Sequence, residues 1–215
     1  MIYKSREEIE NLVSSRFAST YHSLIEIIAL AYSEAYEEVY NKTFNGNFAP
    51  LAPFKKDRLP FKQGWRVEDR LHAWSRNSCG LKPQPQFNSR GKPHLSLLDE
   101  RFHVTPHRVT RPGEFPRDAL YRYGNAATNW YSLPGLNTLN SSERSWYIFL
   151  LHGPFNEDRT KLGFVQLGVP AAYKREYLAL ITIFKAKSTP EQSQIEEIQD
   201  NATPSLKPIK QISEK

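Results

Sequence analysis

Residues 146–184 read WYIFLLHGPFNEDRTKLGFVQLGVPAAYKREYLALITIF, and they carry the clearest structural signal in this 215-residue chain. Trp146–Leu151 is a continuous apolar run, Leu162–Val169 alternates in character, and Leu178–Phe184 is rich in leucine and isoleucine. Turn residues such as Gly153-Pro154 and Pro170 separate the three runs. Consecutive strands with connections of this length predict an antiparallel meander, at least one face of which has to be covered.

The first 44 residues are predicted to provide that cover. Ser5 and Glu8 have the spacing of a helix N-terminal capping box. A break in the helix is expected near Ser19–Thr20. Apolar residues recur at helical spacing on both sides of it: Ile9, Leu12, Val13, Phe17, Leu24, Ile28, Ala31, Ala35 and Val39. We therefore expect an α+β fold, in which a long N-terminal helix or helical hairpin packs on a small, mostly antiparallel sheet.

The segment between these regions is predicted to be proline-rich, irregular and basic. Nine prolines fall between residues 45 and 125, and proline disfavours helix both at its own position and at the one before it. We expect one short helix at Val67–Ser75, strands at Leu95–Thr105 and Ala119–Tyr123, and a long loop at Gly80–Pro93.

The chain is accordingly divided into three parts. Residues 1–44 form the N-terminal helical segment and residues 45–187 a basic α+β body. Residues 188–215 contain no aromatic side chain and are rich in polar residues and proline, which predicts a flexible polar tail.

Cysteine usage and the absence of apolar segments predict a soluble cytoplasmic protein without membrane contact. Cys79 is the single cysteine, so no intrachain disulfide can form. The N-terminus lacks the apolar run of a signal peptide. The most apolar stretch, Leu24–Tyr32, is about half the length needed to span a bilayer, and Glu26 interrupts it.

The net charge of +6 is concentrated in the middle of the chain. Residues 51–125 contain fifteen basic and seven acidic side chains, and ten of the basic ones are arginine. Arginine binds phosphate bidentately, and guanidinium and aromatic faces stack on bases, so this segment predicts binding to DNA or RNA. The candidate contacts are Arg58, Arg66, Arg70, Arg90, Lys92, Arg101, Arg108, Arg111 and Arg117.

Two other interpretations of the charge stay open. In one, the arginines pair with carboxylates such as Glu68 and Asp69 or form a solvated basic surface. The acidic face of the N-terminal helix, with Glu34, Glu37 and Glu38, also suits a basic protein partner or the basic zone of a second copy. The protein would then be an interaction subunit or regulator.

An enzymatic alternative rests on two short patterns. His94-Leu95-Ser96 and His103-Val104-Thr105 both place an imidazole and a hydroxyl on one face of a strand. The order is similar to that in the two-histidine phosphoesterases, although here the two motifs begin nine residues apart instead of in distant parts of the chain. The hypothesis is a metal-independent phosphodiesterase or ribonuclease in which His94 and His103 act as general acid and base.

No metal or cofactor is expected. Pro106 separates His103 from His107, so these two cannot lie one turn apart on a helix, and no second cysteine is available to complete a zinc site. Glycine-rich phosphate loops are absent from the sequence. Cys79 as a nucleophile has only His72 nearby in sequence, and its context favours a turn after a helix.

Overall fold

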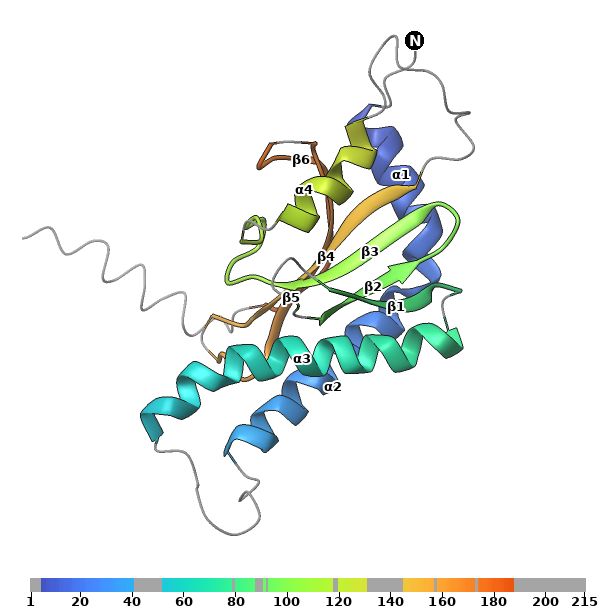
Figure 1. Ribbon diagram of the computed structural model, residues 1–215. Helices are drawn as coiled ribbons and strands as arrows, with labels where there is room; N and C mark the ends of the chain where they lie inside the picture. The colour runs from blue at the N-terminus through green and yellow to red at the C-terminus, as the bar shows by residue number, and fades with distance from the viewer. Residues whose placement is uncertain are drawn as a thin grey trace, which may run out of the picture. The chain divides into compact units, whose positions relative to one another are not determined.

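The computed structural model confirms the α+β class (Figure 1). It describes residues 5–40, 52–78, 80–87, 91, 93–117, 120–130, 145–156, 158–172 and 174–187. The fold belongs to the compact unit Met1–Lys185, and Ala186–Lys215 is a separate unit. The predicted tail at 188–215 lies outside the described residues, as do Cys79, Arg90 and Lys92. In the described part of the chain, no helix is long and apolar enough to cross a membrane.

Two three-stranded meanders make up a single six-stranded sheet. The strands are β1 (Lys82–Phe87), β2 (Pro93–Leu98), β3 (Phe102–Arg108), β4 (Trp146–Pro154), β5 (Leu162–Pro170) and β6 (Tyr177–Lys185), and they lie in sequence order. Every neighbouring pair is antiparallel except β3 and β4, which are parallel. The three strands predicted within residues 146–184 are confirmed as β4, β5 and β6.

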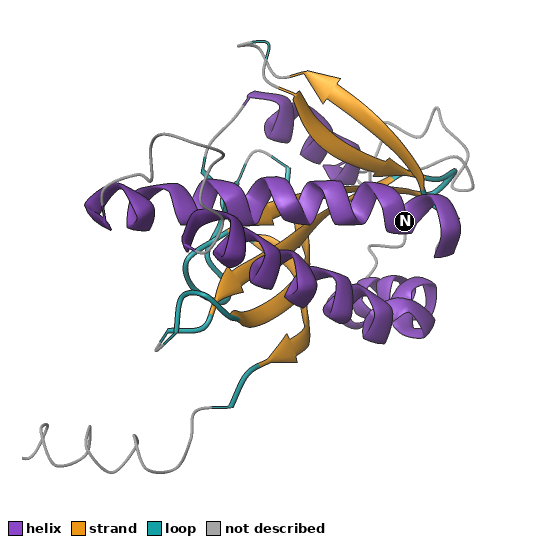
Figure 2. Ribbon diagram, turned by 90° about the horizontal axis from the view of Figure 1, so that it is seen from below, coloured by secondary structure: helices purple, strands orange, loops and turns teal. Residues whose placement is uncertain are grey.

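The N-terminal helices form as predicted, and they cover one face of the sheet (Figure 2). Helix α1 (Arg6–Phe17) starts with the Ser5–Glu8 capping box. The 3₁₀ turn η1 (Ala18–Thr20) stands at the expected break, and α2 (Tyr21–Tyr40) follows. The apolar stripes of these helices pack against inward-facing side chains such as Leu97, Ile148 and Leu167, which form the main core.

Helix α3 (Ala52–Ser78) corrects the prediction of a short helix at Val67–Ser75. It runs 27 residues with Pro60 inside it. Proline costs one helical hydrogen bond, but the helix also buries Leu59, Gln63, Val67 and Leu71 at four-residue spacing along α2 and the sheet. Burial of this stripe outweighs the lost bond. The stripe escaped prediction because one of its members, Gln63, is polar.

A second helix replaces a predicted strand. Residues 119–123 were expected to be extended, whereas α4 (Leu120–Ala126) is helical and continues into η2 (Ala127–Trp130). The physical reason is the topology, because parallel neighbours such as β3 and β4 need a long crossover that a helix usually provides. Ala126 packs on the second face of the sheet with Tyr147, Phe149 and Leu151.

The region from residue 80 to 108 also differs from the prediction. The expected loop at Gly80–Pro93 contains β1, an edge strand in which Pro83 and Pro85 are tolerated. The single strand expected at Leu95–Thr105 is a hairpin, since β2 and β3 are separated by a turn at Asp99. The Asp99 carboxylate accepts the backbone N–H groups of Arg101 at 2.8 Å and Phe102 at 2.6 Å, which fixes the turn.

Candidate functional site

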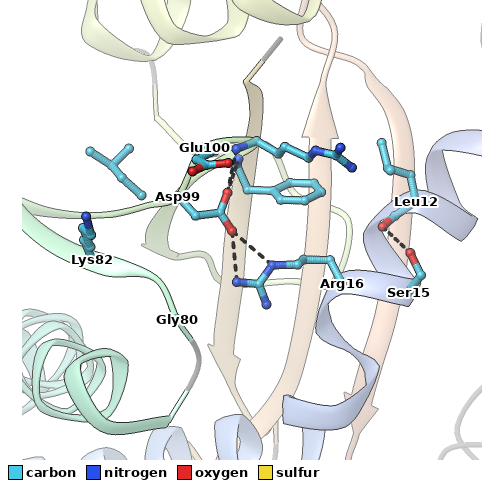
Figure 3. A pocket seen from close by; sticks show the side chains of 10 residues that line it. Leu12, Ser15, Arg16, Gly80, Lys82, Asp99 and Glu100 are labelled. Atoms are coloured by element: carbon cyan, nitrogen blue, oxygen red, sulfur yellow. Dashed lines mark hydrogen bonds and ion pairs between the residues drawn. The ribbon is translucent and has the colours of Figure 1, made fainter. Parts of the chain in front are cut away.

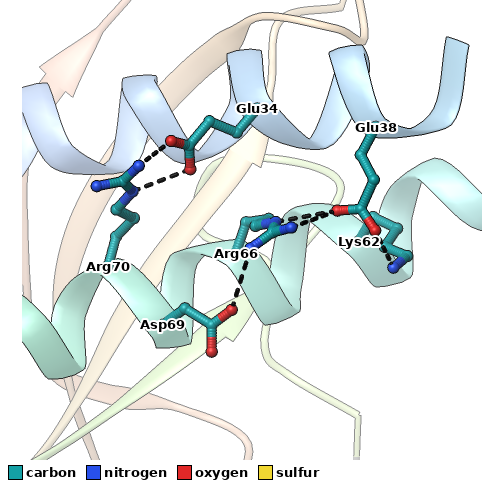
Figure 4. Close-up of polar contacts among 6 residues, drawn as sticks. All are labelled: Glu34, Glu38, Lys62, Arg66, Asp69 and Arg70. Atoms are coloured by element: carbon teal, nitrogen blue, oxygen red, sulfur yellow. Dashed lines mark hydrogen bonds and ion pairs between the residues drawn. The ribbon is translucent and has the colours of Figure 1, made fainter. Parts of the chain in front are cut away.

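One side of α3 faces α2, and an ion-pair ladder neutralises it (Figure 4). Arg70 pairs with Glu34, with Nε 2.9 Å from Oε2. Arg66 donates to Glu38 Oε2 from Nε at 3.0 Å and from Nη2 at 2.8 Å, and Lys62 pairs with the other Glu38 oxygen. The Lys62 bond lowers the pKa of Glu38 below its ordinary value, and Arg66 adds to the effect. Two predicted nucleic-acid contacts, Arg66 and Arg70, are therefore already paired.

The other side of α3 forms one wall of an open groove of about 390 Å³. Phe61 and Trp65 are one helical turn apart, and the two rings are 68% and 61% exposed. Exposure of two large aromatic side chains beside a groove marks a binding surface more often than a structural one. Gly64 lies between them and adds no side chain to this wall, and no atom comes within 4 Å of the position that a Cβ would occupy.

The opposite wall of the groove is cationic and comes from residues 106–122, between the end of β3 and the start of α4. It consists of the end of β3, the following segment up to Arg117, and the first turn of α4 with Tyr121 and Arg122. Arg117 is exposed. Glu114 also lines this wall, but its carboxylate accepts the backbone N–H groups of Thr110 and Arg111 at 2.8 and 3.0 Å.

The floor of the groove lies where β2 and β3 separate. The two strands pair at Leu97–Val104 and Leu98–His103, and continuing that register would set Leu95 opposite Pro106. Proline has no N–H to donate to a ladder. The backbone N–H of Leu95 is instead hydrogen-bonded to Glu68, which reaches over from α3. Burial raises the pKa of Glu68 to about 7, and the charge of Asp69 adds to the rise.

Arg122 is held over the floor by a chain of neutral groups. Its Nη2 lies 3.3 Å from Nδ1 of the buried His107, and a guanidinium can only donate. Nδ1 is thus the acceptor, and Nε2 carries the proton and donates to Thr105 Oγ1 at 2.8 Å. Burial lowers the pKa of His107 well below its usual value, and the Arg122 charge reinforces this. The imidazole is therefore neutral, and the charge of Arg122 is left uncompensated by it.

The two histidines predicted to be catalytic lie on neighbouring strands, but only His94 lines the groove. His103 Nε2 is 3.0 Å from Ser96 Oγ, and burial lowers its pKa to about 4. The His94 ring stacks on Tyr121 with centroids 4.2 Å apart. Within the described structure, both His94 ring nitrogens are buried without a hydrogen-bond partner. Burial lowers the pKa of His94, and Arg122 contributes.

The other predicted contacts are scattered. Arg108 lies in the groove at the end of β3, and Arg111 and Arg117 are exposed on the segment that follows. Arg58 is exposed on α3, outside the residues that line the groove. Arg101 lines a separate cavity of about 760 Å³ between α1 and the β2–β3 turn (Figure 3). That cavity contains Asp99, Glu100 and an ion pair between Arg16 Nη2 and Asp99 Oδ2 at 2.9 Å.

Sequence reasoning missed Glu68, Tyr121 and Arg122 as members of the site. The arginine–aromatic composition of residues 51–125 was a usable signal for Tyr121 and Arg122. The strand predicted at residues 119–123 gave no reason to place either side chain in a binding site. Among the described side chains, no group of three His, Cys, Asp or Glu residues is arranged to hold a metal ion. No family model, curated protein or solved structure matches this chain.

Proposed function

We propose that this protein binds single-stranded nucleic acid along the groove between α3 and the β3–α4 segment. The observation that carries the proposal is the exposure of Phe61 and Trp65 on one wall, across from the guanidinium groups of Arg117 and Arg122. Proteins that bind single strands combine aromatic side chains, on which bases stack, with cations that follow the phosphates.

The spacing of the two aromatic rings suits successive unstacked bases. They stand one turn apart on a helix whose opposite side is anchored by the α2 ion pairs, so the platform is rigid. Base stacking on an aromatic side chain contributes roughly 1–3 kcal/mol per base and tolerates any sequence. A double-stranded partner offers no unstacked bases to such a platform, which favours single strands.

The charges of the groove support an anionic ligand. Arg122 is bonded to a neutral histidine, and the Glu114 carboxylate is bonded to backbone N–H groups. Three arginines, Arg108, Arg117 and Arg122, line the groove together with two carboxylates, Glu114 and Glu68, and the raised pKa of Glu68 of about 7 leaves a large share of it uncharged at neutral pH. Phosphates entering the groove therefore meet a net positive wall.

The proposal is tested with Trp65→Ala and a fluorescently labelled 12-nucleotide strand, followed by anisotropy at 100 mM salt. We expect a loss of affinity of about tenfold, within the range known for one stacked base. Leu30→Ala is the matched control, because Leu30 is an exposed apolar side chain on α2 outside the groove, 46% exposed. Unchanged affinity in the Trp65 variant would refute the stacking platform.

A second candidate function is metal-independent strand cleavage in the same groove. His94 and Glu68 both line it, and burial shifts their pKa values in opposite directions, toward a neutral base and a protonated acid near pH 7. His94 would accept the proton of the attacking hydroxyl, and Glu68 would give one to the leaving oxygen. Cleavage of an RNA strand in the presence of a chelator, lost in both His94→Ala and Glu68→Gln, is the expected result. Activity that persists in either variant would eliminate this pair.

The original pair is tested in the same assay. If His103 takes part, His103→Ala should abolish cleavage as well. If it only holds Ser96, as the 3.0 Å contact allows, His103→Ala should leave the rate of any cleavage unchanged at permissive temperature.

A further inference from the structure

A second cavity of about 420 Å³ adjoins the groove at the end of β3 and β4. It shares Pro60, Arg108 and Thr110 with the groove and therefore borders it. Arg108 and Arg159 are its charged members, and no carboxylate is among the described residues that line it. Thr160 and Gln63 contribute a hydroxyl and an amide group to the lining, which also has an apolar part formed by Leu59, Pro60 and Pro154.

Arg108 is held in this cavity by neutral partners. Its Nε donates to Gln63 Oε1 at 3.0 Å, and its guanidinium also bonds to the hydroxyl of Tyr32. That hydroxyl lies 3.1 Å from Nδ1 of the buried His152. Burial lowers the pKa of Arg108, and the neighbouring charge of Arg159 lowers it further. The negative charge of Glu114 acts on Arg108 from a distance, but it makes no ion pair with the guanidinium. A half-buried cation without a direct ion pair is costly, so an anion bound here would stabilise Arg108 further.

The buried side-chain amide of Gln63 is hydrogen-bonded to both arginines. The Gln63 side chain is fully buried, and while its Oε1 accepts from Arg108, its Nε2 donates to the backbone carbonyl of Arg159 at 2.8 Å. The nearest acidic neighbour in sequence, Asp158, is taken by Lys161 at 3.0 Å and by Thr160. Across the described residues, no carboxylate oxygen pairs with the guanidinium of Arg108 or of Arg159.

We propose that the Arg108–Arg159 cavity binds one phosphate group of the strand in the groove. This inference rests on the proposed function. Two neighbouring guanidinium groups in a cavity whose described lining contains no carboxylate suit the charge of a phosphate, whether terminal or within the backbone. A strand stacked on Phe61 and Trp65 would reach the cavity past Pro60, since both sites share that residue.

The test uses Arg159→Gln, because Arg159 is exposed and the bond that Gln63 makes to it involves only its backbone. Arg6→Gln changes the net charge equally on an exposed arginine of α1 and is the control. Affinity is measured between 50 and 300 mM salt for strands with a 5′-phosphate, with a 3′-phosphate and with neither. We expect Arg159→Gln, and not Arg6→Gln, to weaken binding about tenfold and to reduce the salt slope by about one.

The three strands identify the source of the phosphate. A preference of the wild type for one terminal phosphate, lost in Arg159→Gln, supports a terminal group. An equal loss for all three strands supports a backbone phosphate. Wild-type affinity and salt slope in Arg159→Gln would overturn the inference while leaving the stacking groove intact.

Inorganic phosphate separates failure of this inference from failure of the proposed function. If the wild type binds no strand even at low salt, the proposed function fails, and the cavity is then tested with millimolar phosphate against chloride at equal ionic strength. A rise in melting temperature in the wild type that is absent in Arg159→Gln supports the cavity. No difference between the two proteins overturns it.

Discussion

Basic side chains lie along one long side of α3 and across the groove from the other, and among the described residues only the first set makes ion pairs with carboxylates. Facing α2, Lys62, Arg66 and Arg70 are each matched by a carboxylate. Facing the groove, Arg117 and Arg122 lie across from exposed aromatic rings, and the histidine nearest to Arg122 is neutral. Charge density along the sequence cannot separate these sides. What separates them is whether the fold has already supplied the counter-ion, and only the groove side is left to attract an anionic ligand.

The largest effect is expected when the aromatic wall is removed completely. The double variant Phe61→Ala, Trp65→Ala should bind a single strand about thirtyfold more weakly or worse, since it loses two stacked bases at roughly 1–3 kcal/mol each. Its melting temperature should hardly change, because both rings are mostly exposed. Anisotropy and thermal unfolding measured on the same samples check both parts. A large loss of stability would mean that these rings serve the fold.

Glu68 provides a comparison across pH. Its pKa of about 7 lies above its ordinary value, so the folded state holds this proton more tightly than the unfolded chain. Protonated Glu68 therefore contributes its full share to the free energy of unfolding below about pH 4.5, and this contribution is lost as the pH rises through 7. Glu68→Gln should raise the free energy of unfolding by about 2–3 kcal/mol at pH 8 relative to the wild type. At pH 4 it should change little.

Urea unfolding of both proteins at the two pH values measures this difference. The same substitution should tighten strand binding at pH 8, because it removes a negative charge from the groove. Stability curves that run parallel from pH 4 to pH 8 would show that Glu68 is not held as described.

The paired side of α3 should respond in stability and not in binding. Glu38→Gln removes the carboxylate that Lys62 and Arg66 share, leaves Arg66 only its 3.6 Å contact to Asp69, and should cost about 1 kcal/mol at pH 7. Because the pKa of Glu38 is lowered, its contribution is present at neutral pH and disappears as the pH falls through that lowered value. Chemical denaturation at pH 7 and in acid checks both. Strand affinity that dropped together with stability would contradict the division between the two sides.

The smallest effects sharpen the comparison between individual arginines. Arg70→Gln should leave strand affinity within about twofold of the wild type, because its partner is Glu34. Arg117→Gln, with the same change in charge, should lower the affinity severalfold and reduce the salt slope by about one. Salt titrations of the two variants decide. Equal salt slopes would mean that Arg70 and Arg117 contribute alike, as members of a general basic surface.

The predictable parts of the fold are those in which a local pattern and its tertiary environment agree. The apolar run Trp146–Leu151 and the capping box at Ser5 specify their elements without help, and both form as predicted. Helix α3 was largely missed because Pro60 contradicts it locally and because the buried stripe that overrides this proline includes the polar Gln63. Helix α4 was missed because its conformation follows from the parallel pairing of β3 and β4.

The kind of chemistry at the candidate site was predictable from the sequence, but most of the residues that form the site were not. Arginine–aromatic composition pointed to the right segment, and it included Arg108 and Arg117. Nothing in the sequence distinguishes Arg66, which is paired, from Arg117, which is exposed. Glu68 looks like any solvent-facing carboxylate of a helix, and its role depends on an N–H of Leu95 across from Pro106. Contacts of this kind between distant residues cannot be predicted from residue spacing in the sequence.

The parallel pairing of β3 with β4 also has a kinetic consequence. Each meander closes through short connections, whereas the partners Arg108 and His152 are far apart in the chain. Contacts between distant residues form late, since the chain must first give up the entropy of a long loop. Arg108 and Arg159 stand on opposite sides of this seam, and Arg122 belongs to the crossover that bridges it. We therefore expect the cationic surface to assemble late in folding, so that a partly folded chain has the aromatic wall without the charges across from it.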